Sequence, residues 1–190
     1  MRLPLFAAAV AMLAALAGPA QAQPAPGAPD GSSIYAPPPG FEVIDDIPLR
    51  ADQAGFAVMR TTGGRKDRVG ACVLGISTLG GSPNLDTWAG MIAAHRTDTE
   101  AKARATAKAP MTFISLGGYR DLALPDGGDG YVYWFDQRRP DGLQETRLIA
   151  VGLIKPRSLF AGNCTSAKGT SFTPAEVERI LKLVSSARRP

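Results

Sequence analysis

The sequence is poor in the side chains that support most enzymatic chemistry, because its 190 residues include one histidine and two cysteines. Any Ser-His or Cys-His nucleophile scheme would have to use His95, and no G-x-S-x-G motif is present. One histidine and the distant pair Cys72 and Cys164 cannot complete a zinc site without recruited acids. We therefore expect no metal and no cofactor, and any enzymatic activity stays an open question at this point.

Long apolar runs and basic stripes are also scarce. After the N-terminus, no apolar run reaches the roughly 18 residues that a membrane-spanning helix requires. The formal charge of +4 is not gathered into clustered Lys and Arg stripes, which argues against a nucleic-acid partner. An apolar fraction of 45% and a charged fraction of 20% are typical of a globular protein.

Residues 1–22 have the pattern of a removable export signal. Arg2 supplies a positive charge, residues 3–17 carry none, and Ala20-Gln21-Ala22 places small residues at the expected cleavage site. We expect the mature chain to begin at Gln23 and to be periplasmic or secreted. In an oxidising compartment Cys72 and Cys164 are expected to form a disulfide, with free buried thiols as the alternative.

The mature chain divides into a leader and one domain. Residues 23–40 are rich in proline and glycine, which favours a flexible leader, either disordered or acting as a spacer or as a ligand for a proline-binding groove. Residues 41–190 are long enough for a single α+β domain with its own core.

Short β-prone runs separated by turn residues predict a mostly antiparallel sheet. The runs are 41–44, 54–60, 70–79, 111–116, 119–124, 131–136, 147–155 and 158–165, and the first hairpin is expected to have a long charged tip. One helix is expected to open at Ser82-Pro83 and to run to about Arg96, while residues 97–109 have a helical composition without large apolar residues.

A second helix is predicted by the capping box Thr173-Pro174-Ala175-Glu176. An apolar stripe follows it at helical spacing, formed by Val177, Ile180, Leu181 and Val184. We expect an α+β fold in which the sheet is covered by the helix of the N-terminal half and by this C-terminal helix.

The order of these elements resembles the PsbP-like superfamily of small secreted or lumenal proteins. Pro39-Gly40-Phe41 enters the first strand, and residues 147–187 read as two long strands and a helix that ends in Leu183-Val184-Ser185-Ser186. The resemblance covers residues 40–187 and rests on patterns of apolar and turn residues. It implies an α/β/α sandwich and a non-catalytic accessory role in binding a larger assembly or a ligand.

Two predicted hairpin tips carry basic clusters. The first contains Arg60, Arg65, Lys66 and Arg68, and the second contains Arg138 and Arg139. If both tips lie at the same end of the sheet, they could hold an acidic partner or a lipid head group, whereas separately each is a solvated turn. The expected partner is therefore an envelope protein or an anionic envelope component.

The leading hypothesis is an exported periplasmic, non-catalytic accessory or binding protein of the cell envelope. The alternative is a small periplasmic hydrolase that uses His95 or carboxylates such as Asp121, Asp126 or Asp136. That alternative predicts a deep pocket that joins two acids with displaced pKa values. A third hypothesis is a structural envelope component that acts through its proline-rich leader.

Overall fold

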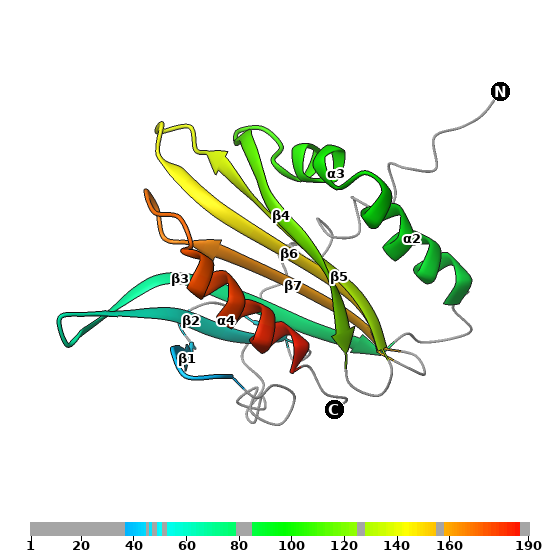
Figure 1. Ribbon diagram of the computed structural model, residues 1–190, viewed down its shortest axis with the longest axis horizontal. Helices are drawn as coiled ribbons and strands as arrows, with labels where there is room; N and C mark the ends of the chain where they lie inside the picture. The colour runs from blue at the N-terminus through cyan, green and yellow to red at the C-terminus, as the bar shows by residue number, and fades with distance from the viewer. Residues whose placement is uncertain are drawn as a thin grey trace.

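The computed structural model describes residues 37–44, 46, 49–50, 53–78, 85–124, 128–154 and 158–186. Its strands form one seven-stranded antiparallel sheet in the order β1-β2-β3-β7-β6-β5-β4 (Figure 1). The strands are β1 (Phe41–Val43), β2 (Gln53–Thr62), β3 (Arg65–Thr78), β4 (Thr112–Leu124), β5 (Gly128–Arg138), β6 (Gln144–Ile154) and β7 (Ser158–Ser166). The helices are α2 (Leu85–Thr97), α3 (Thr99–Thr106) and α4 (Pro174–Ser185).

Helix α4 covers the middle of one face of the sheet (Figure 1). Successive residues of a strand point to opposite faces, so every second residue of the central strands faces this helix. Cys72 and Cys164 are directly opposed on β3 and β7, are fully buried in this core, and have sulfur atoms 2.06 Å apart. The apolar stripe predicted for the C-terminal helix packs here, which confirms that helix, its capping box and the disulfide.

The opposite face carries a smaller aromatic core. Tyr131, Tyr133 and Phe135 alternate along β5 and are buried there against Ile92 of α2 and Ala103 of α3. The tyrosine hydroxyls are hydrogen-bonded to the hydroxyls of Thr99 and Thr106, so neither polar group is stranded in the core. Helices α2 and α3 pack on β4, β5 and β6.

The prediction of a helix-covered α/β/α sandwich is wrong, because the described residues form a β-rich antiparallel sheet with three short helices. The reason is one of length. A 12-residue helix such as α4 is about 18 Å long, whereas the 14-residue strand β3 spans about 46 Å. Helices of this size cover only part of each face of the sheet.

Two boundaries also differ from the predictions. The sequence predicts separate strands over 111–116 and 119–124, but residues 112–124 form the single strand β4, whose register shifts between Phe113 and Ser115 and between Leu116 and Gly118. A side chain at Gly117 would collide with Trp134, since its Cβ would lie 2.6 Å from the indole Cδ1. Gly117 and Gly118 therefore leave space for the indole ring of Trp134, and the strand continues through them without a turn.

The first hairpin has a short tip, not the long charged loop that we predicted. Gly63 and Gly64 form a two-residue turn with positive φ angles of 59° and 81°, as tight hairpins require. The basic residues after them therefore belong to β3. The helical composition of residues 97–109 corresponds to the separate helix α3, whose N-cap is Asp98.

Several sequence predictions lie outside the described residues. These are the export signal, the leader up to residue 36, the Ser82-Pro83 helix start and Asp126. Within the described part of the chain, no helix has both the length and the apolar character that crossing a membrane requires.

Candidate anion-binding site

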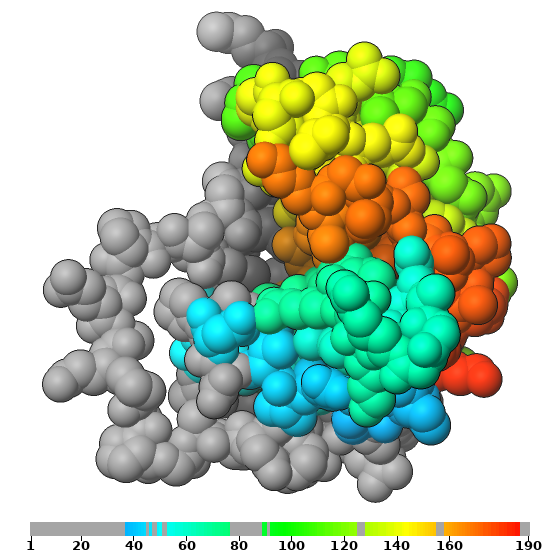
Figure 2. Space-filling model, turned by 90° about the vertical axis from the view of Figure 1, so that its left-hand side faces the viewer, coloured from blue at the N-terminus to red at the C-terminus, as the bar shows by residue number. Residues whose placement is uncertain are grey.

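The sheet topology brings three connections to one end of the molecule. Strands β3 and β6 begin at this end and β7 finishes there, because β7 pairs antiparallel with both. The β2–β3 turn, the β5–β6 turn and the start of the β7–α4 connection are therefore neighbours. Figure 2 views this end directly and shows the segments near residues 65, 140 and 165 stacked side by side.

An open recess of about 370 Å³ lies between these connections. Its cationic lining comes from three segments, with Arg68 on β3, Arg139 in the β5–β6 turn and Lys168 after β7. The remaining lining residues are Gly70, Ala71, Glu145, Thr165, Ser166 and Ala167. Ala71 and Thr165 are cross-strand partners adjacent to the buried cysteine pair, so their side chains lie on the face opposite α4.

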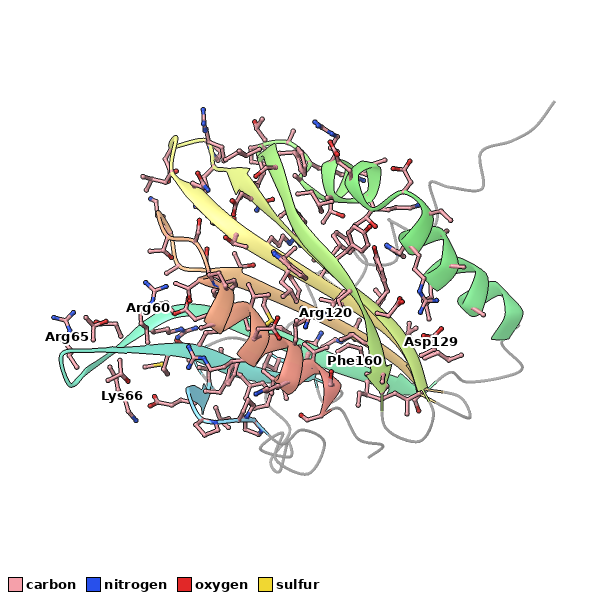
Figure 3. The ribbon with its side chains drawn as sticks, viewed as in Figure 1. Arg60, Arg65, Lys66, Arg120, Asp129 and Phe160 are labelled. Atoms are coloured by element: carbon pink, nitrogen blue, oxygen red, sulfur yellow. A yellow bond between two sulfur atoms is a disulfide. The ribbon has the colours of Figure 1, made fainter. Side chains whose placement is uncertain are left out.

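The structure brings together two of the six basic residues that the sequence singled out, Arg68 and Arg139. Arg65 and Lys66 lie at the far tip of the β2–β3 hairpin and point away from the sheet (Figure 3). Arg138 is exposed and does not line the recess. The shared end of the two hairpins thus holds a smaller cationic site than the sequence suggested.

Arg60 has a structural role on the other face. Its Nε and one terminal nitrogen each donate to the Glu176 carboxylate at 2.7 Å, and this carboxylate also accepts from the Thr173 backbone N–H at 2.8 Å. Burial by itself would raise the pKa of Glu176, but the hydrogen bonds from Arg60 and Thr173 outweigh it and hold that pKa below its ordinary value. Arg60 therefore fixes the start of α4 to the sheet.

Most cations at this end of the molecule already have a carboxylate partner. Arg68 pairs with Asp46 at 2.7 Å, and Lys168 pairs with Asp141 at 2.7 Å. Arg139 pairs with Glu145 at 3.1 Å, and the Glu145 side chain is only 5% exposed. Because these cations are paired with carboxylates, the described residues at this end form no broad positive surface. An anion would therefore have to be bound by short-range contacts inside the recess.

Arg147 is a half-buried cation that forms no ion pair among the described residues. It lies on β6 directly opposite Thr165 of the recess, on the same face of the sheet. Its guanidinium is half-buried and donates to the side-chain oxygen of Asn163 at 3.1 Å, and no carboxylate of the described residues forms an ion pair with it. Burial lowers the pKa of Arg147, and the electrostatic influence of Tyr133 and Glu145 offsets this only in part.

His95 lies away from the recess. It stacks on Tyr133 with ring centroids 5.9 Å apart, and its Nδ1 is buried with no hydrogen-bond partner in the structure. Burial and the nearby Lys102 both lower its pKa. Within the described part of the chain, no hydrogen bond links a nucleophilic side chain to Nδ1 of this ring, so these residues assemble no nucleophile activated through that nitrogen.

The proposed catalytic carboxylates are not brought together either. Asp121 is exposed and pairs with Arg96 at 2.6 Å, and Asp136 accepts a hydrogen bond from the Thr146 hydroxyl at 2.7 Å. The recess is lined by one carboxylate, Glu145, where the hydrolase hypothesis needs two. Among the residues that the structure describes, no group of three His, Cys, Asp or Glu side chains is placed to hold a metal ion.

Lys168 and Arg147 were not among the basic residues that the sequence singled out as binding candidates. Lys168 stands beside Gly169 directly after a strand, and antiparallel strand order alone places that position at the end where β3 begins. Arg147 is the last of the polar residues that open β6, and the strand is apolar from Leu148 onward. A cation next to the apolar part of a strand was therefore the feature of the sequence that could have indicated a binding site.

Comparison with known proteins adds little to this geometry. No family model matches the chain, and no curated protein matches it. Among solved structures, a protein of unknown function from Pseudomonas aeruginosa, PA94, described as a putative regulator, aligns with 13% identity and a TM-score of 0.42. The alignment covers 79% of this chain and 98% of that protein.

Proposed function

We propose that this protein is an exported, non-catalytic binding protein of the cell envelope that holds an anionic group in the recess lined by Arg68, Arg139 and Lys168, next to Arg147. The observation that carries the proposal is the half-buried guanidinium of Arg147, which has an amide partner in Asn163 and no carboxylate. The export signal and the disulfide between Cys72 and Cys164 are consistent with work in an oxidising compartment.

An unneutralised, half-buried charge costs folding free energy, so its presence calls for a functional explanation. Arg60 shows how the same chain treats a structural arginine, since it has a carboxylate at hydrogen-bond distance. A ligand anion would give Arg147 a direct ion pair, whereas Glu145 acts on it electrostatically without forming one. Arg68, Arg139 and Lys168 on the neighbouring recess wall would add further donors.

The near balance of charge around the recess limits the type of ligand. A long polyanion needs an extended positive surface, whereas this end of the molecule pairs its exposed cations with acids. A single anionic group on an envelope component fits a recess of about 370 Å³, which lies at the small end of ligand sites.

The test is titration of the mature protein with a panel of small anions, followed by isothermal calorimetry and by backbone amide chemical shifts. The panel contains inorganic phosphate, sulfate, succinate and glycerol 3-phosphate. We expect at least one anion to bind and to shift the amides of Ala71, Thr165 and Lys168. Arg147→Gln should weaken that binding about tenfold or more, because it removes a charge-assisted hydrogen bond.

The matched control is Arg104→Gln, which removes the same charge from an exposed arginine on α3 that pairs with Glu100. It should bind like the wild type. The proposal is wrong if no anion in the panel perturbs the recess, or if Arg147→Gln and Arg104→Gln bind equally well. Export is tested separately by mass spectrometry of native material, which should find Gln23 as the first residue.

A further inference from the structure

A carboxylate at the edge of the recess already pairs with two of the recess cations. Asp141 lies in the β5–β6 turn, with its Oδ2 2.7 Å from Nζ of Lys168 and 3.5 Å from Nε of Arg139. Its side chain is 37% exposed, and its other oxygen accepts from the Leu143 backbone N–H at 3.2 Å. Two recess cations are thus held by an acid at the recess edge, on a turn.

The Asp141 carboxylate leaves one donor of the recess cations without a hydrogen bond. Nε of Arg139 is buried and makes no hydrogen bond, since the Asp141 oxygen remains 3.5 Å away. The pKa of Asp141 is lowered, first by the hydrogen bond from Lys168, so the carboxylate is charged at neutral pH. A buried donor without an acceptor costs free energy, and a ligand oxygen at hydrogen-bond distance would remove that cost.

The charge of the lining indicates which anion fits better. Arg68, Arg139, Lys168 and the Glu145 carboxylate line the recess, which gives it a formal charge of +2 once Asp141 has moved away from Lys168. A phosphate monoester carries about −1.5 to −2 at pH 7 and has three terminal oxygens, whereas a carboxylate carries −1 and has two. Guanidinium groups bind phosphate through paired N–H donors.

We propose that the ligand of the recess is a phosphate monoester, and that Asp141 holds its place in the unliganded protein. This inference rests on the proposed anion-binding function and deepens it. On binding, the phosphate displaces the Asp141 carboxylate from Lys168 and accepts from Nε of Arg139 and Nζ of Lys168. No covalent bond forms or breaks.

The first arm of the test compares ligands by calorimetry at pH 7.5. Glycerol 3-phosphate should bind at least about tenfold more tightly than succinate, which has a similar charge on two separate carboxylates, and than the monoanion dimethyl phosphate. Its affinity should fall between pH 7.5 and pH 5, because the second proton of a phosphate monoester binds with a pKa near 6. Vesicles containing phosphatidic acid, compared with vesicles of a neutral lipid, distinguish a lipid head group from a soluble phosphate.

The second arm removes the internal anion. Asp141→Asn should increase the affinity for glycerol 3-phosphate about threefold, since the ligand no longer competes with an ion pair of the protein. The control is Asp67→Asn, which makes the same charge change at the hairpin tip, where Asp67 pairs with Arg65 outside the recess. It should leave the affinity unchanged, because that pair is exposed to solvent and distant from the site.

The outcomes separate this inference from the function on which it rests. If succinate or sulfate binds as tightly as glycerol 3-phosphate at the recess, the protein is an anion-binding protein and the phosphate assignment is wrong. If Asp141→Asn binds no better than Asp67→Asn, the place-holding role of Asp141 is wrong. If no anion binds at all, both the proposed function and this inference fall.

Discussion

At the scale of single residues, Arg60 and Arg147 show two treatments of the same side chain. Arg60 gives both donors of one edge to Glu176, whose side chain is 2% exposed, so the pair is matched and holds two elements together. Arg147 is half-buried beside an uncharged amide. The first arrangement contributes to stability, whereas the second lowers it and keeps a charge available for a ligand.

This contrast predicts opposite effects of the same substitution. Arg147→Met should leave the free energy of unfolding unchanged or raise it by about 1 kcal/mol, because methionine fills a similar volume without burying an unneutralised charge. Arg60→Met should lower it by about 3 kcal/mol, because the buried Glu176 carboxylate loses its cation. Urea unfolding at pH 7 measures both. A large loss of stability in Arg147→Met would show that this arginine is structural and would weaken the proposed site.

At the scale of elements, α4 was predictable because its signals are local. The capping box spans four residues and the apolar stripe repeats within three turns, so neither depends on distant contacts. The Gly117-Gly118 pair was misread for the opposite reason. Its role is to admit Trp134 from a neighbouring strand, a contact that no local pattern reveals.

The cap of α4 gives a prediction for pH dependence. The pKa of Glu176 in the folded protein lies below its ordinary value of 4.5, because the hydrogen bonds of Arg60 and Thr173 outweigh burial. The carboxylate therefore contributes stability that is complete above about pH 4.5 and is lost as the pH falls toward the folded pKa. Glu176→Gln should lower the free energy of unfolding by about 1–3 kcal/mol at pH 7 and by less at pH 4.

The control for this prediction is Glu178→Gln on the same helix, because Glu178 is 52% exposed and pairs with an equally exposed Arg120. Its effect should stay below about 0.5 kcal/mol at both pH values. Equal losses for the two variants in urea unfolding at pH 7 would contradict the structural role assigned to Glu176.

At the scale of the whole molecule, the sequence indicated that basic hairpin tips could lie near one another, but not which cations would line the recess. Basic hairpin tips were identified, and antiparallel order does bring them to one end of the sheet. The sequence did not indicate that Arg65 and Lys66 would project past the recess or that Lys168 would complete it. These features depend on the exact turn residues and on strand register, which long-range pairing fixes.

The disulfide gives a prediction for the whole fold, because it joins neighbouring central strands that are far apart in the sequence. Cys72 and Cys164 are 92 residues apart and connect β3 to β7 beneath α4. Closing a loop of this length restricts the unfolded chain, and in the chain-entropy account this contributes on the order of 4 kcal/mol. A Cys72→Ala, Cys164→Ala double variant should lose stability of about that size in urea unfolding.

Reductant separates the crosslink from the loss of packing in that variant. The wild type should lose most of the same stability when reduced, whereas the double variant should not respond to reductant. Alkylation of the unreduced native protein under denaturing conditions should label neither sulfur. If both sulfurs are labelled and reductant leaves the wild-type midpoint unchanged, the two strands are held by the sheet alone, and the case for an oxidising compartment loses its chemical support.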